Sequence, residues 1–359
     1  MKKKSILFIA DKPNWAYHNL IKTWATGLTE FDCYIAFEED FLIRSKKFSF
    51  VEKLLINNIN VLRKKEKSYN IDRSLTFSFP NYKYPPVYEV NSGKKVNLKN
   101  FDIIYECAFY FQFMAKIPFV SNRKYVGIYT DSFPHEGPNY DAKTSTNLHE
   151  LNRKEFFTKY LQNYDGIIVG NSNLLEDYKS LSNKIVFANG IFRQDDFIEN
   201  KNVGKNDGLT IGWTGNPNRA MKGFREVIEP AIELVKSTGR KINLKTKFTG
   251  SYDEILEFYT DVDLIVIASE ADTGPSLFAE ASLSNVPSIS TRIGFPKMII
   301  QDRVNGIFVN RDINEIRDAI IELYDDRELL SQFSNKIKSD YLKQLDNSFS
   351  IQNLKKLFS

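Results

Sequence analysis

The sequence predicts an α/β fold built of two parallel-sheet domains, and three features of its patterning indicate this. Short apolar or β-branched runs alternate with longer amphipathic stretches, which is typical of parallel strands joined by crossover helices. Near-continuous apolar runs such as ILFIA and GIIVG suit strands that are covered on both faces. A polar, glycine-containing stretch at about 200–208 separates two rounds of this alternation, and 359 residues suffice for two domains.

The first domain is expected over 1–204 and the second over 205–344. Strands of the first are predicted at 5–10, 33–37, 102–106, 124–129, 166–170 and 184–188, while 41–100 has no regular pattern. In the second, strands are predicted at 209–213, 243–248, 263–268 and 286–290, and helices at about 221–238, 276–284, 312–324 and 326–343. Pro230 should kink the first of these helices or mark its boundary.

Composition indicates an ordinary cytoplasmic globular protein. Hydrophobic residues make up 42% of the chain and charged residues 26%. Only Cys33 and Cys107 are present, which excludes a disulfide framework and favours two buried, reduced thiols. The apolar run after MKKK ends at Asp11, too early for a signal peptide, so a first core strand is the better interpretation. We therefore expect a chain without a membrane span and without a zinc site.

The net charge of +4 is unevenly distributed. Residues 1–205 carry +7 and the remainder −3, and 41–100 alone have nine more basic than acidic side chains. This stretch is either a solvated lysine-rich surface or a basic face. A basic face would contact anionic lipid at the inner side of the plasma membrane, or a pyrophosphate-linked acceptor. We expect no nucleic acid partner, because no recognition motif accompanies the charge.

The loop after the strand at 209–213 is a candidate phosphate site. Gly215, Asn216 and Pro217 end the strand, and Arg219 and Lys222 stand where the next helix should begin. Backbone N–H groups at a helix start, together with two cations, can hold a phosphate. The alternative is a solvated helix start with two surface cations, because the stretch is neither a GxGxxG motif nor a P-loop.

The loop after the strand at 263–268 is a candidate sugar-nucleotide site. Gly274 and Pro275 predict a turn, so Asp272 precedes a helix and Glu280 lies about one turn inside it. A carboxylate buried in such a helix needs a partner, and a sugar or ribose diol can donate two hydrogen bonds to it. The alternative is a surface glutamate on an amphipathic helix.

The run DLIVIASEADTGPSLFAEASLSNVPSISTRIGFPKMIIQDRVNGIFV resembles the signature region of retaining glycosyltransferases of family 4. That resemblance implies the GT-B fold: two Rossmann-like domains facing across a cleft, with a C-terminal helix (about 345–359) crossing back to the first domain. It implies that Glu280 binds the ribose hydroxyls, Lys222 the diphosphate and Asp272 the transferred sugar. Phosphate and sugar contacts are implied for the backbone of five consecutive residues: Thr273, Gly274, Pro275, Ser276 and Leu277.

Two positions depart from the family pattern. Asp272 stands where the family usually has glutamate, and Glu270 has the wrong spacing to Glu280 to replace it. The family's arginine would fall on Pro217, which leaves Arg219 as its replacement.

The first half resembles the family less closely, as expected for a domain that binds a variable acceptor. Asp11 and Trp15 follow the first strand and are candidate acceptor contacts, with Trp15 either a sugar platform or a hydrophobic staple. Asp131 and His135 follow the strand at 124–129 and are candidate catalytic residues. Asn189 and Gly190 are expected to shape the domain junction.

Together these features predict a glycosyltransferase that moves a sugar from a nucleotide-diphosphate sugar to a glycan, a lipid-linked sugar or a surface polymer. The resemblance implies retention, a UDP-linked rather than GDP-linked donor, and catalysis without metal. The triplet 261–263 (Asp-Val-Asp) reads as a helix–strand junction instead of a metal site. Two alternatives stay open: a catalytically silent subunit supporting a partner transferase, and a sugar-nucleotide epimerase.

Overall fold

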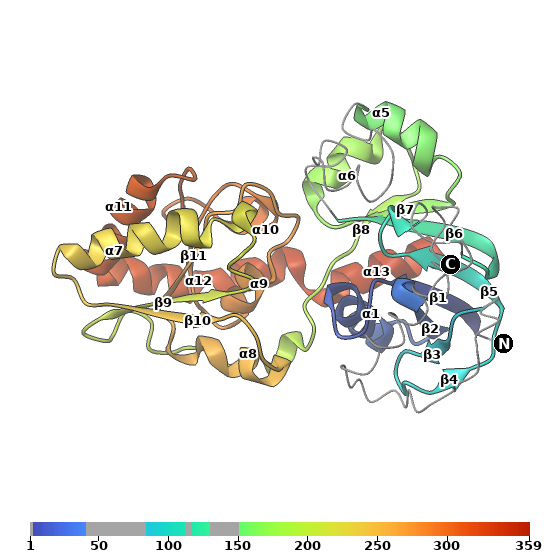
Figure 1. Ribbon diagram of the computed structural model, residues 1–359, viewed down its shortest axis with the longest axis horizontal. Coiled ribbons are helices and arrows are strands. Elements are labelled where there is room, and N and C mark those ends of the chain that lie inside the picture. The colour runs from blue at the N-terminus through green and yellow to red at the C-terminus, as the bar shows by residue number, and fades with distance from the viewer. Residues whose placement is uncertain (1–2, 41–83, 112–116, 130–150) are drawn as a thin grey trace, which may run out of the picture.

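The computed structural model describes residues 3–40, 84–111, 117–129 and 151–359, which form two lobes, each built on one β-sheet (Figure 1). The sheet of the first lobe has the order β4-β3-β2-β1-β5-β6-β7-β8. Six of its strands are parallel: β1 (Lys4–Ala10), β2 (Phe31–Phe37), β5 (Asn100–Glu106), β6 (Val120–Ile128), β7 (Gly166–Val169) and β8 (Ile185–Phe187). Each of the six strands predicted in this half is therefore present.

Antiparallel strands β3 (Val87–Glu89) and β4 (Lys95–Val96) extend one edge of this sheet, within the stretch to which no structure was assigned from sequence. The described helices and helical turns of the lobe are α1 (Ala16–Gly27), η1 (Glu38–Asp40), α5 (Arg153–Phe156), the π-helix η4 (Phe157–Leu161), α6 (Ser172–Lys179) and η5 (Gln194–Asp196).

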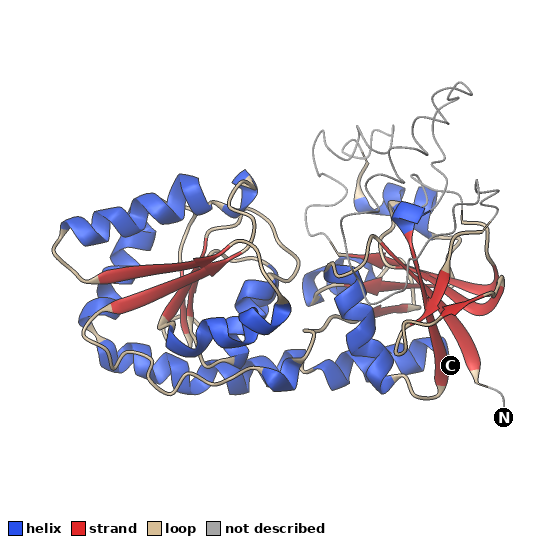
Figure 2. Ribbon diagram, turned by 60° about the horizontal axis from the view of Figure 1, so that its bottom comes forward, coloured by secondary structure: helices blue, strands red, loops and turns tan. Residues whose placement is uncertain are grey.

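The sheet of the second lobe is wholly parallel, with the order β10-β9-β11-β12-β13. Its strands are β9 (Leu209–Thr214), β10 (Ile242–Lys247), β11 (Leu264–Ile267), β12 (Ser288–Ser290) and β13 (Gly306–Phe308). Its helices are α7 (Glu229–Ser237), α8 (Tyr252–Phe258), α9 (Ser276–Leu283), α10 (Gly294–Ile299), α11 (Ile313–Asp325) and α12 (Arg327–Leu345). They cover both faces of the sheet (Figure 2).

One helix of the second lobe was predicted as continuous, and this prediction is wrong. The stretch 221–238 is divided into a 3-10 turn η6 (Ala220–Lys222), a π-helix η7 (Phe224–Ile228) and α7. Gly223 separates the first two with φ +68°, a conformation that glycine adopts without strain. Pro230 lies in the first turn of α7, where its missing N–H is not needed, so the predicted boundary is confirmed.

Apolar side chains on both faces bury each sheet. All four residues of β11 are buried, which explains why its sequence LIVI does not alternate with polar residues. In the first lobe, β1 contributes five buried residues, from Ile6 to Ala10. The prediction of strands covered on both sides is thereby confirmed.

Helix α13 (Asn347–Phe358) leaves the second lobe after α12 and packs on α1 and β8 of the first (Figure 1). Leu354 and Phe358 are fully buried in the core of the first lobe. The Ser350 hydroxyl accepts a hydrogen bond from the backbone N–H of Asn189 at 2.9 Å, and Asn347 exchanges two hydrogen bonds with the backbone of Ile191. The predicted crossing helix is confirmed, and Asn189 and Gly190 lie at the junction, as expected.

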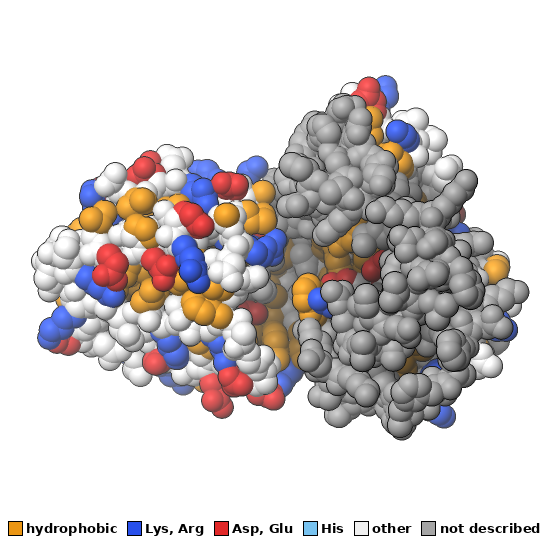
Figure 3. Space-filling view, in the orientation of Figure 1, with side chains coloured by type: hydrophobic (Ala, Val, Ile, Leu, Met, Phe, Trp, Pro, Cys, Tyr) orange, Lys and Arg blue, Asp and Glu red, His pale blue; other side chains and the backbone are white. Residues whose placement is uncertain are grey.

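No helix of the described residues is long and apolar enough to cross a bilayer. Cys107 is buried and Cys33 is partly buried, and both are free thiols. On the face of the second lobe seen in Figure 3, basic and acidic side chains are interspersed among apolar ones. Most of the basic stretch 41–100, to which we assigned a membrane or pyrophosphate contact, lies outside the described residues.

Candidate active site

The loops that follow β9 and β11 lie side by side, because these two strands are neighbours in the parallel sheet. The backbone N–H of Glu270 donates to the Met221 carbonyl at 2.9 Å, which ties the second loop to the first. Gly223 allows this close approach, since a Cβ there would lie 2.7 Å from the Ala268 carbonyl oxygen. The two stretches that the sequence singled out therefore lie against each other and form one candidate site.

Lys222 and Asp272 form an ion pair across these loops, with Lys222 Nζ donating to Asp272 Oδ2. Their side chains are 22% and 16% exposed, so solvent screens the pair only in part. Lys222 lies at the end of η6 and Asp272 lies four residues before the first residue of α9. The structure thus brings together the candidate phosphate ligand and the candidate sugar ligand.

Glu280 lies on the buried face of α9 and is only 6% exposed. Its Oε2 accepts a hydrogen bond of 2.9 Å from the Tyr259 hydroxyl. Burial raises the pKa of Glu280 to about 7, and the Tyr259 hydrogen bond acts in the opposite direction. The alternative of a surface glutamate is therefore wrong, because the carboxyl group is enclosed and partnered by a hydroxyl.

The stretch 273–275 is enclosed by residues of both lobes. A Cβ at Gly294 would overlap the carbonyl oxygens of Asp272 and Thr273, and one at Gly170 of the first lobe would lie 2.6 Å from Thr273 Cγ2. Asn171 Nδ2 donates to the Thr273 carbonyl at 3.0 Å. Thr273 Oγ1 is buried and has no hydrogen-bond partner among the described residues.

Helix α9 begins at Ser276, with Pro275 in extended conformation at its N-cap. The first backbone N–H groups of a helix have no acceptor within it, so those of Ser276 and Leu277 are available at this end. Gly274 packs against the Phe295 ring, where a Cβ would lie 2.5 Å from a ring carbon. The predicted helix start and turn are confirmed, and the helix points its positive end at the loop that contains Asp272.

The side chains of Arg219 and Asn216 have partners within their own loop. The Arg219 side chain is exposed and donates to Met221 Sδ, and Asn216 Oδ1 accepts from the Asn218 N–H at 3.0 Å within its own loop. Gly215 is exposed at the turn, with φ +135°. Neither polar side chain contacts Lys222 or Asp272 in the described part of the chain.

Arg311, after β13, is a site residue that sequence reasoning missed. Its Nε donates to the Ala268 carbonyl at 2.9 Å and its Nη2 to the Ala220 carbonyl at 2.7 Å, so it joins both loops. Its Nη1 also forms an ion pair of 2.9 Å with Glu270. Because Glu270 is paired with Arg311, it does not take the place of Asp272 as the candidate sugar ligand.

The acidic triplet at 261–263 has structural partners. Asp263 accepts hydrogen bonds of 2.8 Å from the backbone N–H groups of Gly204 and Thr210, and Asp261 forms an ion pair with Lys245. Both carboxylates lie where η8 (Tyr259–Asp261) leads into β11. The prediction of a helix–strand junction is confirmed.

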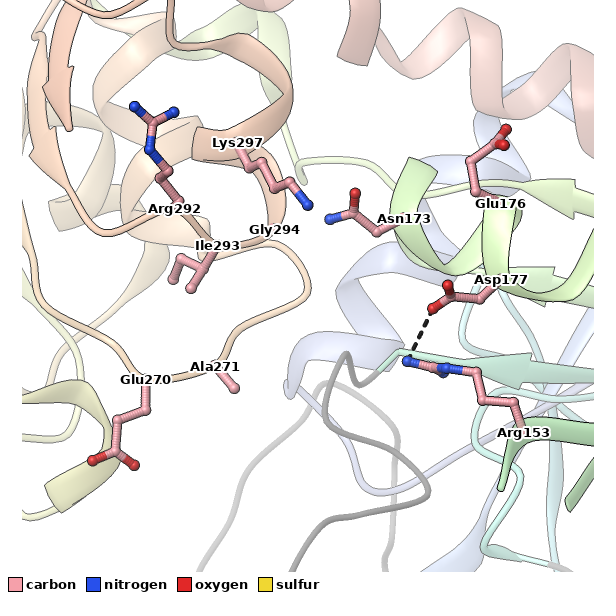
Figure 4. Close-up of a pocket in the computed structure, with 10 residues that line it drawn as sticks. All are labelled: Arg153, Asn173, Glu176, Asp177, Glu270, Ala271, Arg292, Ile293, Gly294 and Lys297. Atoms are coloured by element: carbon pink, nitrogen blue, oxygen red, sulfur yellow. Dashed lines mark ion pairs between the residues drawn. The ribbon is translucent and has the colours of Figure 1, made fainter. Parts of the chain in front are cut away.

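A cleft of about 460 Å³ lies between the two lobes beside this loop. Figure 4 shows that its residues come from both sides, with Lys297 of α10 pointing toward Asn173 of α6. Arg153 and Asp177 form an ion pair of 2.9 Å on the wall contributed by the first lobe. Charged and amide groups dominate the lining, which consists of Arg153, Asn173, Glu176, Asp177, Glu270, Ala271, Arg292, Ile293, Gly294 and Lys297.

Asp11 and Trp15 lie where β1 ends and α1 begins. Trp15 is 49% exposed and the Lys12 ammonium lies 3.0 Å from its ring centroid, an arrangement that does not suit a hydrophobic staple. Burial raises the pKa of Asp11, whose Oδ1 has no hydrogen-bond partner within the described ranges. Asp131 and His135 lie outside the described residues.

One protein family matches a part of the chain that lies in the second lobe. Residues 225–340 match the family described as glycosyl transferases group 1. No curated protein matches the chain.

Solved structures that share the fold of the chain have low sequence identity to it. A TarM structure is 13% identical, with a TM-score of 0.60 over 100% of this chain and 99% of the other. An S. aureus TarM mutant bound to fondaparinux, α-GlcNAc-glycerol and UDP is 18% identical, with a TM-score of 0.52, and the match covers 76% of this chain but only 62% of that one.

Two further structures share the fold over nearly the full length of both chains. The Rickettsia africae glycosyltransferase is 14% identical, with a TM-score of 0.59 over 100% of this chain and 98% of the other. HepE from Anabaena, with bound UDP-glucose, is 12% identical, with a TM-score of 0.59 over 99% of each chain. These solved structures share with the chain the GT-B fold of two Rossmann-like domains, and within that fold residues 225–340 match the group 1 glycosyltransferase family.

Proposed function

We propose that the protein transfers a sugar from a nucleotide-diphosphate sugar to a hydroxyl-bearing acceptor, with retention of configuration. The observation that carries the proposal is the junction of the β9 and β11 loops, which brings Lys222 and Asp272 into contact beside the N-terminus of α9. Cations and free backbone N–H groups are the donors that a diphosphate needs.

In this proposal Glu280 accepts hydrogen bonds from the ribose hydroxyls and Lys222 neutralises the diphosphate. Charge grows on the leaving diphosphate as the bond to the sugar breaks, and fixed positive groups lower the energy of that transition state. Lys222 and the N-terminus of α9 supply such groups without a metal ion, and Asp261 and Asp263 are already engaged elsewhere. Asp272 contacts the transferred sugar.

A UDP-linked donor is supported by the bound ligands of two similar structures, UDP-glucose in HepE and UDP in the TarM complex. The cleft between the lobes is our candidate for the acceptor, which we take to be a glycan, a lipid-linked sugar or a surface polymer. Its mixed amide, carboxylate and cationic lining suits an acceptor rich in hydroxyl groups. Trp15 and Asp11 remain candidate acceptor contacts, and Asp131 and His135 remain candidate catalytic groups.

Incubation with a panel of nucleotide sugars tests the reaction class. Release of the nucleotide only when acceptor is present supports transfer. A changed sugar without nucleotide release would support the epimerase, and binding without turnover would support the silent subunit.

Calorimetric titration with UDP and GDP tests the site. We expect Glu280→Ala and Lys222→Ala each to weaken UDP binding at least tenfold, since each removes a charged hydrogen-bonding partner. Lys241→Ala is the matched control, because Lys241 pairs with Asp207 on the exposed surface of the same lobe. Unchanged affinity in both site variants would show that the nucleotide binds elsewhere.

Asp272→Asn separates binding from transfer. The amide keeps the shape of the side chain but removes the negative charge that neutralises Lys222 and repels a diphosphate. UDP should then bind several-fold more tightly, while sugar transfer falls because the sugar loses its contact. Equal weakening of both would contradict the assignment of Asp272 to the sugar.

A further inference from the structure

Tyr259 lies at the start of η8, the short helix that precedes β11 in the chain. It is fully buried, and its ring contacts Phe258 edge-on at 5.0 Å between centroids. Its hydroxyl oxygen lies 2.9 Å from Glu280 Oε2 and 3.3 Å from the Thr214 hydroxyl oxygen, at the end of β9. Tyr259 therefore connects the β9 loop to helix α9.

The direction of these hydrogen bonds follows from the donors available. A tyrosine hydroxyl has one proton, and a carboxylate can only accept, so the Tyr259 proton goes to Glu280 when that group is ionised. Thr214 must then donate to Tyr259, which gives a chain running from Thr214 through Tyr259 to Glu280. Each step favours the ionised form of the carboxyl group.

Tyr259 is the neighbour that stabilises the ionised form of Glu280. The titratable side chains that influence it are Tyr252 of α8, Tyr259 itself and Tyr341 of α12, all of them neutral near pH 7. Strand β11, which also packs on α9, is wholly apolar, and Lys297, the charged residue of α10, lines the cleft. Among the described residues, Tyr259 provides the hydrogen bond that lowers the pKa of Glu280 against the effect of burial.

We propose that Tyr259 is a positioning residue for nucleotide binding, holding Oε2 of Glu280 so that Oε1 stays free and ionised for a vicinal diol. Oε1 accepts no hydrogen bond within the described part of the chain, as a vacant acceptor for a ribose hydroxyl requires. This assignment rests on the proposed function, because it takes the ribose of a nucleoside diphosphate as the diol. Tyr259 thereby joins the residues of the proposed nucleotide site, although it contacts Glu280 and β9 and need not contact the nucleotide.

The test is Tyr259→Phe in the full chain, with Tyr252→Phe as the matched control. Tyr252 is a tyrosine of the same lobe whose hydroxyl donates to the Phe192 carbonyl at 2.7 Å, so the control loses a comparable hydrogen bond elsewhere. UDP affinity is measured by calorimetry between pH 5.5 and about 9, and Glu280→Gln supplies the pH dependence of UDP itself. We expect the affinity of the wild-type protein, relative to Glu280→Gln, to rise as the pH increases through about 7.

In Tyr259→Phe the midpoint of that rise should move to higher pH by about one, and UDP binding at pH 7 should weaken roughly tenfold. The difference from wild type should shrink at the high-pH end, where Glu280 is ionised in both proteins. Tyr252→Phe should keep the wild-type midpoint. An unchanged midpoint in Tyr259→Phe, or an equal loss of affinity at every pH, would overturn the proposal, since a merely structural hydroxyl predicts that result.

A second measurement separates this proposal from the proposed function. The pKa of Glu280 is followed by NMR of carboxyl-labelled glutamate, with Glu280→Gln identifying its signal, and it should rise in Tyr259→Phe without any ligand. If that pKa does not move, the Tyr259 assignment is wrong even when UDP binds. If it moves but wild type binds no nucleoside diphosphate, the proposed function is wrong, and with it the role of Tyr259 in nucleotide binding.

Discussion

Replacement of Asn171 by alanine removes two buried hydrogen bonds, one that caps a helix and one that joins the two lobes. Asn171 is fully buried, and its Oδ1 accepts from the Leu174 N–H at 2.9 Å, which caps helix α6. Its Nδ2 donates to the Thr273 carbonyl at 3.0 Å, which holds the proposed sugar-binding loop against the first lobe. The two contributions can be separated, because serine also caps helices but has no amide to donate.

Loss of the cap costs about 1 kcal/mol, and a buried carbonyl left without a donor costs about 1–3 kcal/mol. We therefore expect Asn171→Ala to destabilise the protein by about 2–4 kcal/mol, and Asn171→Ser by about 1 kcal/mol less. In a chain of this size 2 kcal/mol lowers the melting temperature by roughly 3 °C. Both variants should also bind UDP more weakly, since both free the same loop.

Scanning calorimetry and UDP titration measure these effects, with Asn173→Ala as the control. Asn173 lies on the same helix but points into the cleft, so its replacement should spare both the cap and the Thr273 contact (Figure 4). If Asn171→Ser keeps the wild-type melting temperature and UDP affinity, the contact between the lobes has no energetic importance and our reasoning is refuted.

Three further predictions concern the same site. Burial raises the pKa of Glu280 from its ordinary 4.5 to about 7, so the folded protein becomes less stable as the pH rises between these values. Relative to Glu280→Gln, the free energy of unfolding of the wild type should fall by about 3 kcal/mol between pH 4.5 and 8, as measured by urea unfolding. The same pH dependence of unfolding in both proteins would contradict this. Gly294→Ala should weaken UDP binding, measured by calorimetry, at least tenfold. The added Cβ would overlap two carbonyl oxygens of the proposed sugar-binding loop, and residue 294 has a φ of +32°, which alanine rarely adopts. Wild-type affinity in this variant would mean that the loop adapts to the larger side chain. Arg311→Lys should weaken UDP binding several-fold, because one ammonium group cannot contact Ala268, Ala220 and Glu270 at the same time. The control Arg317→Lys, on the exposed face of α11, should leave UDP binding unchanged. Equal affinities of the two variants would refute the bridging role of Arg311.

Much of the architecture could be predicted because local patterning and burial agree. The run ILFIA forms a fully buried strand, and Gly274 and Pro275 end one element and begin the next. The position of Glu280 followed in the same way, from a helix after a core strand. Its enclosure by tyrosines confirms the idea that a buried carboxylate needs a partner.

Residues that act through long-range contacts could not be found this way. Arg311 is a lone arginine in a polar loop, and only the neighbouring positions of β9, β11, β12 and β13 in the sheet bring it to Ala220 and Ala268. Tyr259 looks like an ordinary core aromatic, because sequence does not show where a hydroxyl points. The division of 221–238 was missed since the αL conformation of Gly223 follows from its packing against Ala268, which has no local signal.

The return of α13 to the first lobe has a consequence for how the chain folds during synthesis. Leu354 and Phe358 complete a core whose other members lie mostly before residue 130, and α1 packs directly against this helix. The first lobe therefore leaves the ribosome with part of its apolar surface uncovered, and about 150 residues separate its end near residue 204 from Leu354, which helps to close that surface. During this interval it is a natural client for chaperones, and both cores become complete only near the end of synthesis, because the core of the second lobe extends to Leu345.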